Sequence, residues 1–167
     1  MNITSEIIMD VITIICSIIA IGLSVWSLIE TKKHNQWDRE AENKRRKDDL
    51  DKQLARILEI TIEYPYLESP SFTKKWEHEA REWRNDNKYN LDEKYMRYDQ
   101  FCNILFNFLS NVHAFYKGNR KEIEDYIDVK NWVRLHGQIW NFPLMEGENA
   151  DAYSEEFRKY INSYIQS

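Results

Sequence analysis

The amino-acid sequence predicts an all-α protein with one N-terminal transmembrane helix, a charged stalk helix and an aromatic-rich cytoplasmic helical bundle. Three observations predict this class. Residues 11–29 contain no charged side chain, the chain has only four glycines and three prolines, and apolar side chains recur at steps of three and four residues through its second half. Few turn-forming residues together with this period are typical of long helices.

The uncharged run predicts a transmembrane helix over residues 11–29, preceded by a short extracytoplasmic segment over residues 1–10. As a helix, its 19 residues would be about 28 Å long, close to the roughly 30 Å hydrocarbon core of a bilayer. A cleaved signal peptide is the competing interpretation. Residues 1–10 contain no basic side chain and no small-residue cleavage site follows the run, so we expect an uncleaved anchor.

The distribution of basic residues predicts the orientation of this anchor. All 23 Lys and Arg residues follow the run, which places the N-terminus outside and the rest of the chain in the cytoplasm, as a single-pass protein of the cell (inner) membrane. Four residues are expected at the membrane surface because aromatic and basic side chains favour the lipid headgroups. These are Trp26, Lys32, Lys33 and Trp37.

Small side chains follow one another along the predicted span at alternating steps of four and three residues. Such a stripe lets two helices approach closely in lipid and predicts self-association. The alternative is that each hydroxyl bonds only to its own helical turn. The residues are Thr13, Ser17, Ala20, Ser24 and Ser27.

Residues 30–63 predict a charged stalk helix, because no glycine or proline interrupts them and 12 of the 16 residues from 38 to 53 are charged. Pro65 disfavours helix at the residue before it and ends the stalk. Leu50, Leu54 and Ile57 form an apolar seam near its end, which predicts a short coiled coil between copies. The basic cluster at 44–47 could contact anionic lipid only if the stalk lay along the membrane.

Residues 64–167 predict the cytoplasmic bundle. Ser69 followed by Pro70 is a helix start, and Asn90 with Glu93 three residues later predicts the N-cap of the central helix. That helix carries the widest apolar stripe in the chain and ends before Gly118. The stripe comprises Tyr98, Phe101, Cys102, Ile104, Leu105, Phe106, Phe108, Leu109, Val112 and Phe115.

Two further caps and a final amphipathic segment complete the predicted bundle. Asn119 with Glu122 opens one helix, and Asp128 opens the next. The last helix is predicted from an aromatic and aliphatic stripe that begins at Tyr153 and continues through residues 157–165.

Most catalytic and cofactor-binding motifs are incompatible with the sequence. Glycines stand only at positions 22, 118, 137 and 147, so neither a phosphate-binding loop nor a dinucleotide fingerprint can be formed. No histidine has a glutamate three residues earlier, which excludes the di-iron bundle motif. We therefore expect neither an enzyme nor a cofactor or metal.

A few polar residues are of types that can bind metals or take part in catalysis. His78 with Glu82 one turn later could supply two metal ligands, although two solvated side chains are the simpler interpretation. His136 lies on an apolar face, where a hydrogen-bonded core histidine is more common than a catalytic base. Cys102, also on an apolar face, is expected to be buried and inert.

The charge balance restricts the partners. All 23 basic residues but only 26 of the 28 acidic ones lie after the predicted span, a net charge of −3 for the tail. Nucleic-acid binding requires a basic face and is not expected. The layout resembles a loose group of uncharacterised bacterial single-span membrane proteins, and the end of the chain, with Trp140, Tyr153, Phe157 and Ile161, is similar to the close of their domains. This resemblance implies a topology and no catalytic residues.

The leading hypothesis is a non-enzymatic, self-associating membrane protein whose bundle binds a cytoplasmic protein. The alternative is a membrane effector in which clustered anchors permeabilise the bilayer through the hydroxyls of the small-residue stripe. An enzyme of unfamiliar type, using His136 or His113 with carboxylates of the bundle, is the third hypothesis.

Overall fold

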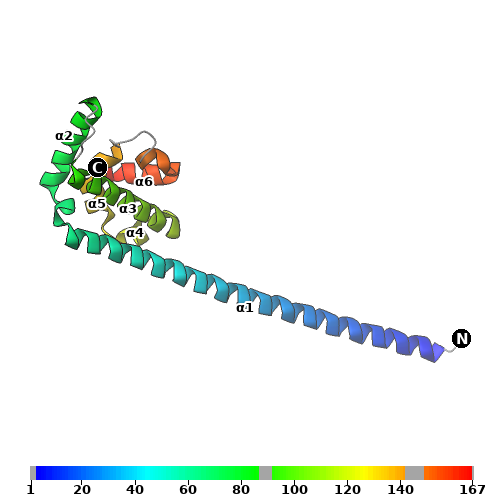
Figure 1. The fold of residues 1–167 in the computed structure, drawn as a ribbon. Coiled ribbons are helices and arrows are strands. Elements are labelled where there is room, and N and C mark those ends of the chain that lie inside the picture. The colour runs from blue at the N-terminus through cyan, green and yellow to red at the C-terminus, as the bar shows by residue number, and fades with distance from the viewer. Residues whose placement is uncertain (1–2, 87–91, 142–148, 167) are drawn as a thin grey trace. The chain divides into compact units, whose positions relative to one another are not determined.

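The computed structural model describes residues 3–86, 92–141 and 149–166, and the side chains of residues 20–83, 92–141 and 150–166. Every regular element in these ranges is helical, which confirms the all-α prediction (Figure 1). The elements are α1 (Ile3–Glu63), η1 (Pro65–Glu68), α2 (Pro70–Asp86), α3 (Glu93–Phe115), α4 (Arg120–Tyr126), α5 (Val129–Asn141), η2 (Asn149–Ala152) and α6 (Glu155–Ile165). The chain forms two compact units, Met1–Arg45 and Arg46–Ser167.

The first unit consists of the N-terminal part of α1. The side chains of residues 20–45 are exposed in it, including a group of large apolar ones. None of the helices, over the residues described, has a segment both long and apolar enough to cross a membrane. The side chains of residues 11–19, which belong to the run predicted to span the bilayer, lie outside the described residues.

The second unit begins earlier in the chain than the predicted bundle. The boundary expected at residue 64 lies at Arg46, so residues 46–63 belong to the bundle rather than to a solvated stalk. The physical reason is the apolar seam of this segment. Leu50 and Ile57 are buried in the bundle core and Leu54 packs against it. The seam predicted to join two copies therefore packs inside one chain.

The connection after α1 is a single 3-10 turn that packs into the core and contacts α3. α1 ends at Glu63, as Pro65 predicted, and η1 buries Leu67 completely. Arg97 of α3 donates from Nη1 to the Tyr66 hydroxyl at 3.0 Å, and its guanidinium lies 4.3 Å from the centre of the Tyr64 ring. The predicted helix start at Pro70 is confirmed.

α3 contributes nine buried residues to the core, but its N-terminus differs from the prediction. Asp92, not Asn90, is the N-cap, and its carboxylate accepts a hydrogen bond from the Lys94 N–H at 2.9 Å. Asn90 lies outside the described residues. Both residue types are good N-caps, so composition alone could not choose between them.

The apolar stripe of α3 is narrower than predicted, because Ile104 is exposed. The other nine residues predicted for this stripe are buried or pack against the core. Ile104 instead belongs to an exposed line of three polar and three apolar side chains along α3. This line comprises Met96, Gln100, Ile104, Asn107, Asn111 and Ala114.

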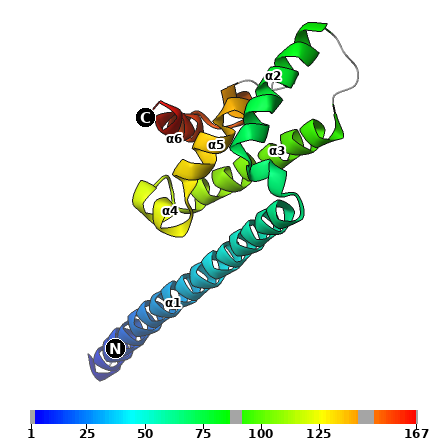
Figure 2. The ribbon, with the colours of Figure 1, turned by 90° about the vertical axis from the view of Figure 1, so that its left-hand side faces the viewer.

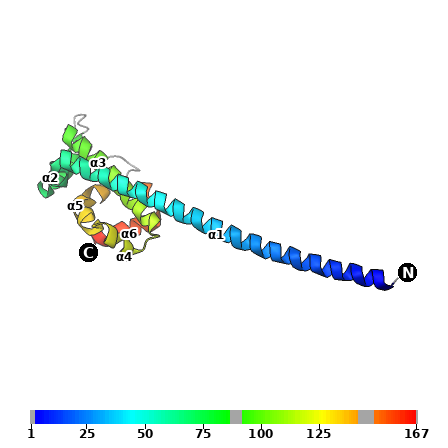
Figure 3. The same cartoon turned by 90° about the horizontal axis from the view of Figure 1, so that it is seen from below.

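The last three α-helices begin at well-formed caps. Asn119 and Glu122 cap α4 reciprocally, and the Asp128 carboxylate accepts from the Asn131 N–H at 3.0 Å at the start of α5, as predicted. Ser154 caps α6. α5 packs against α2, α3 and α6, an arrangement that can be followed in Figures 2 and 3. The Gly118 predicted to follow the central helix has a φ of +72°, which glycine adopts without strain.

Two isoleucines of α1 provide a test of the revised boundary. Ile57 is 0% exposed, whereas Ile62, five residues later, is 79% exposed. We expect Ile57→Ala to lower the free energy of unfolding of the bundle by about 2–5 kcal/mol, through lost burial and a cavity. Ile62→Ala should change it by less than about 0.5 kcal/mol. Denaturant unfolding followed by circular dichroism measures both, and equal effects would contradict this assignment.

Candidate functional site

The most chemically distinctive part of the bundle is a buried polar cluster around His136 of α5. Val129, Val133 and Trp140 share the buried face of this helix with His136, because they recur at steps of three and four residues. The imidazole is therefore carried into the core, where it is 0% exposed. The prediction of a core histidine is confirmed.

Three polar groups from two other elements surround the imidazole. The Tyr98 hydroxyl of α3 lies 3.0 Å from His136 Nδ1, and Cys102 Sγ lies 3.9 Å from the same nitrogen. On the other side of the ring, Glu68 Oε1 at the end of η1 lies 3.7 Å from His136 Nε2. The Phe101 ring packs edge-on against the imidazole, with 5.5 Å between ring centres. The cluster thus joins η1, α3 and α5.

The protonation states restrict what this cluster can do. Burial raises the pKa of both the Tyr98 hydroxyl and the Cys102 thiol. The tyrosine keeps its proton and can donate it to Nδ1, so that the proton-bearing Nε2 faces Glu68. A protonated, buried thiol is not a nucleophile. His136 and Tyr98 are both 0% exposed, so neither side chain presents any surface to solvent.

The other histidines predicted as candidates are nearer to the surface. His78 and Glu82 form an exposed pair on α2, with 3.4 Å between Nε2 and Oε1. Within the described ranges, no group of three or more His, Cys, Asp or Glu side chains could hold a metal ion. His113 of α3 is half-buried beneath the rings of Phe157 and Tyr160, and burial lowers its pKa.

His113 also lines a shallow groove of about 260 Å³ between the end of α3 and the start of α6. Lys117, Ser154 and Glu156 contribute to the same groove. The Ser154 hydroxyl accepts the Phe157 N–H as the N-cap of α6, at 3.4 Å. The hydrogen bond of the Ser154 hydroxyl therefore serves to cap α6.

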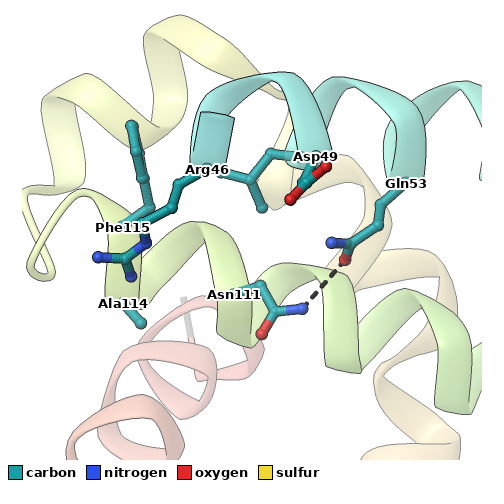
Figure 4. A pocket seen from close by; sticks show the side chains of 7 residues that line it. Arg46, Asp49, Gln53, Asn111, Ala114 and Phe115 are labelled. Atoms are coloured by element: carbon teal, nitrogen blue, oxygen red, sulfur yellow. Dashed lines mark hydrogen bonds between the residues drawn. The ribbon is translucent and has the colours of Figure 1, made fainter. Parts of the chain in front are cut away.

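A second groove, of about 270 Å³, lies between the last part of α1 and the end of α3 (Figure 4). Leu50 closes its base, and the Asn111 amide donates to Gln53 Oε1 at 3.0 Å across it. Figure 4 shows Arg46 beside Phe115, with its guanidinium 5.9 Å from the ring centre. The groove therefore offers hydrogen-bonding groups, the cation of Arg46 and the carboxylate of Asp49 on an accessible surface.

The residues predicted to mediate self-association have different environments. Leu50 and Ile57 are in the core and Leu54 is half-buried, so these three residues are not available to a second copy. Ala20, Ser24 and Ser27 are exposed on α1, whereas the side chains of Thr13 and Ser17 lie outside the described residues. The Ser24 hydroxyl donates to the Ala20 carbonyl at 2.8 Å, which is the bond to its own turn that the alternative interpretation expected.

The four residues predicted for the membrane surface are all exposed on α1: Trp26, Lys32, Lys33 and Trp37. The residue that sequence reasoning missed is Glu68. It follows Pro65 in a four-residue turn, and nothing in its spacing from residue 136 indicates that the two side chains meet. Only the bundle packing brings η1 against α5.

Comparison with known proteins adds no assignment, because no family model, curated protein or solved structure matches the chain.

Removing the Tyr98 hydroxyl tests the structural role of the cluster. We expect Tyr98→Phe to lower the free energy of unfolding by about 1–3 kcal/mol, because it leaves the buried His136 Nδ1 with only the weak contact to the Cys102 thiol at 3.9 Å. Tyr153→Phe is the matched control. It removes an exposed hydrogen bond of the same length, 3.0 Å to Asn107 Oδ1, and should cost less than about 1 kcal/mol. A neutral Tyr98→Phe variant would contradict this role.

The tyrosines also predict an alkaline limit of stability. Burial raises the pKa of Tyr98 and Tyr160, and that of Tyr153 to about 12. A tyrosine in the unfolded chain ionises near pH 10, so the stabilisation is complete below pH 10 and is lost as the pH rises towards 12. We expect tyrosine ionisation, followed at 295 nm, to coincide with loss of helix by circular dichroism. Ionisation of most tyrosines near pH 10 in an intact bundle would contradict this.

Proposed function

We propose that the chain is a single-pass membrane protein that self-associates through its anchor and binds a cytoplasmic protein through its bundle, without catalysis of its own. In this proposal residues 11–29 cross the cell membrane, the N-terminus is outside and the bundle is cytoplasmic. The observation that carries the proposal is the uncharged run of 19 residues within α1, after which all 23 basic residues follow.

The exposure of the apolar side chains on α1 supports a bilayer as their partner. Six large apolar residues between positions 21 and 29 are 50–71% exposed. Leaving such side chains in water costs about 25 cal/mol per Å² of apolar surface, whereas lipid would cover them on every side. They are Ile21, Leu23, Val25, Trp26, Leu28 and Ile29.

Self-association is assigned to the small residues of the anchor alone. Because Leu50 and Ile57 are buried in the bundle, a coiled coil through them is not part of the proposal. The bond from Ser24 to its own helical turn means that close packing of small side chains, more than hydrogen bonds between helices, would stabilise the contact.

The bundle supports a binding role because its most reactive groups are buried. Cys102, His136 and Tyr98 are 0% exposed, whereas the groove at Arg46, Gln53 and Asn111 is open. A protein partner could use its hydrogen-bonding groups and the guanidinium. The proposal assigns recognition to this surface, and we expect Ala114→Arg, at an exposed position that lines the groove, to weaken partner binding with little effect on the fold.

Two small residues of α1 give a matched test of the self-association. Ala20 and Gly22 lie about 200° apart around a helix, and only Ala20 belongs to the small-residue stripe. We expect Ala20→Leu to shift the detergent-purified full chain towards the monomer, and Gly22→Leu to leave the oligomer intact. A side chain at Gly22 meets nothing within 4 Å in the chain. Light scattering measures the mass of each variant.

Three controls separate the parts of the proposal and its alternative. Resistance of the full chain to carbonate extraction tests the anchor itself, and its release would reject the membrane assignment. A fragment from Arg46 onward, the start of the second unit, should be monomeric. An oligomeric fragment would move the self-association to the bundle. A membrane-potential dye tests the effector alternative, since an interaction protein should leave the potential unchanged.

A further inference from the structure

Two side chains of α1 that can bind a metal ion lie one helical turn apart in the first unit. His34 Nε2 lies 3.6 Å from Asp38 Oδ2, and the two side chains are 74% and 65% exposed. An imidazole and a carboxylate at positions i and i+4 of a helix can coordinate the same ion, and a closed zinc site takes four such ligands. Because the described residues of one chain form no group of three or more such ligands, the remaining two would have to come from a second copy.

The pair lies on the same face of α1 as the small-residue stripe. Continuing the stripe beyond Ser27 by its own steps of four and three residues reaches, in order, Thr31, His34, Asp38 and Ala41. At about 100° per residue, the members of this series from Ala20 to Asp38 fall within an arc of about 80° around the helix. The next step would be Arg45, whose charge would repel its counterpart in a second copy, so the stripe ends at Ala41.

Self-association through this stripe would bring two copies of the pair together. Copies anchored in one membrane with the same orientation are parallel, so a two-fold axis along the helices sets each residue beside its own counterpart. Packed helices have axes about 8–10 Å apart, and the short side chains of Thr31 and Ala41 on either side leave room for the longer ligands. His34 is five residues beyond Ile29, about 8 Å along the helix axis, so an ion can reach it from water.

The charges of the pair favour a divalent cation between the two copies. Two Asp38 carboxylates that face each other repel and oppose association. One divalent cation neutralises both, and two neutral imidazoles add nitrogen ligands without adding charge. Two nitrogens and two oxygens suit Zn²⁺, which binds both kinds of ligand in a tetrahedral arrangement.

We propose that His34 and Asp38 of two copies of this chain bind one Zn²⁺ between the two α1 helices. This inference rests on the proposed self-association of the anchor and adds a metal ion that stabilises it. By linkage, a cation that binds only the paired chains shifts the equilibrium towards the dimer as its concentration rises.

Zinc titration of the tag-free full chain in detergent, with a fluorescent zinc chelator as competitor, tests the site. We expect one Zn²⁺ per two chains, and light scattering should show more dimer with zinc than with EDTA. His34→Ala and Asp38→Ala should each weaken zinc binding by at least about 100-fold, because each removes two direct ligands and even an outer partner is worth about 10–100-fold. His78→Ala is the matched control. It removes a histidine of the same spacing on α2, 3.4 Å from Glu82, and should leave this binding unchanged.

The outcomes separate the metal site from the self-association beneath it. Equal zinc binding by the wild type and His34→Ala would overturn the inference. Tight binding by a monomeric Ala20→Leu variant would also overturn it, because the site would then lie within one chain. If the wild type is an oligomer that binds no zinc, the self-association stands and only the metal site fails. If the wild type is a monomer with and without zinc, both fail.

Discussion

The packing of the last turns of α1 into the bundle is the interaction on which the rest of this structure depends. Leu50 and Ile57 supply apolar surface to the core, and polar contacts at the rim determine the register of the helix. The Tyr126 hydroxyl donates to Asp51 Oδ1 at 2.6 Å, and Asn111 donates to Gln53. Without residues 46–63, the core would lose this apolar surface, Asn111 of α3 would lose Gln53, and Tyr126 of α4 would lose Asp51.

A second constraint is the pairing of polar groups inside an aromatic core. Aromatic side chains fill much of the interior, and they pack mainly edge-on or tilted, as around Tyr98, which contacts Phe72, Trp76 and His136. A histidine in such a core is costly unless both ring nitrogens meet polar atoms. Tyr98 satisfies one nitrogen, whereas Glu68 lies 3.7 Å from the other, close enough for an ion pair but beyond hydrogen-bond distance. The cluster therefore ties the short η1 turn to two helices.

Much of the fold could be predicted because its signals are local. The all-α class, the helix end before Pro65 and the caps at Asn119 and Asp128 each depend on a few adjacent residues. The errors arose where tertiary packing decides. The period of three and four that buries Leu50 and Ile57 is the same for a second copy as for α3, so the sequence could not assign their partner. Ile104 shows the same limit, because a helix that is apolar nearly all round does not indicate which of its sides is exposed to solvent.

The candidate sites also differ in whether they depend on local sequence or on tertiary packing. Trp26, Lys32, Lys33 and Trp37 are predicted from residue type and position along one helix. They are exposed on α1, and their place at a membrane surface stays a prediction. The contact between Glu68 and His136 joins residues 68 positions apart and depends on how η1 packs against α5. No local sequence pattern encodes this contact, and the spacing of the two residues along the chain does not predict it.

The burial of the reactive side chains leaves the surface as the means by which the bundle could act. The groove at Asn111 lies between α1 and α3, so an occupant would contact both helices. By linkage, anything that binds only the packed form stabilises that packing by an amount set by its affinity and concentration. A partner in this groove would therefore strengthen the contact between residues 46–53 and the end of α3. Binding and the integrity of the domain are then coupled through the same side chains, Gln53 and Asn111, that already hold α1 in place.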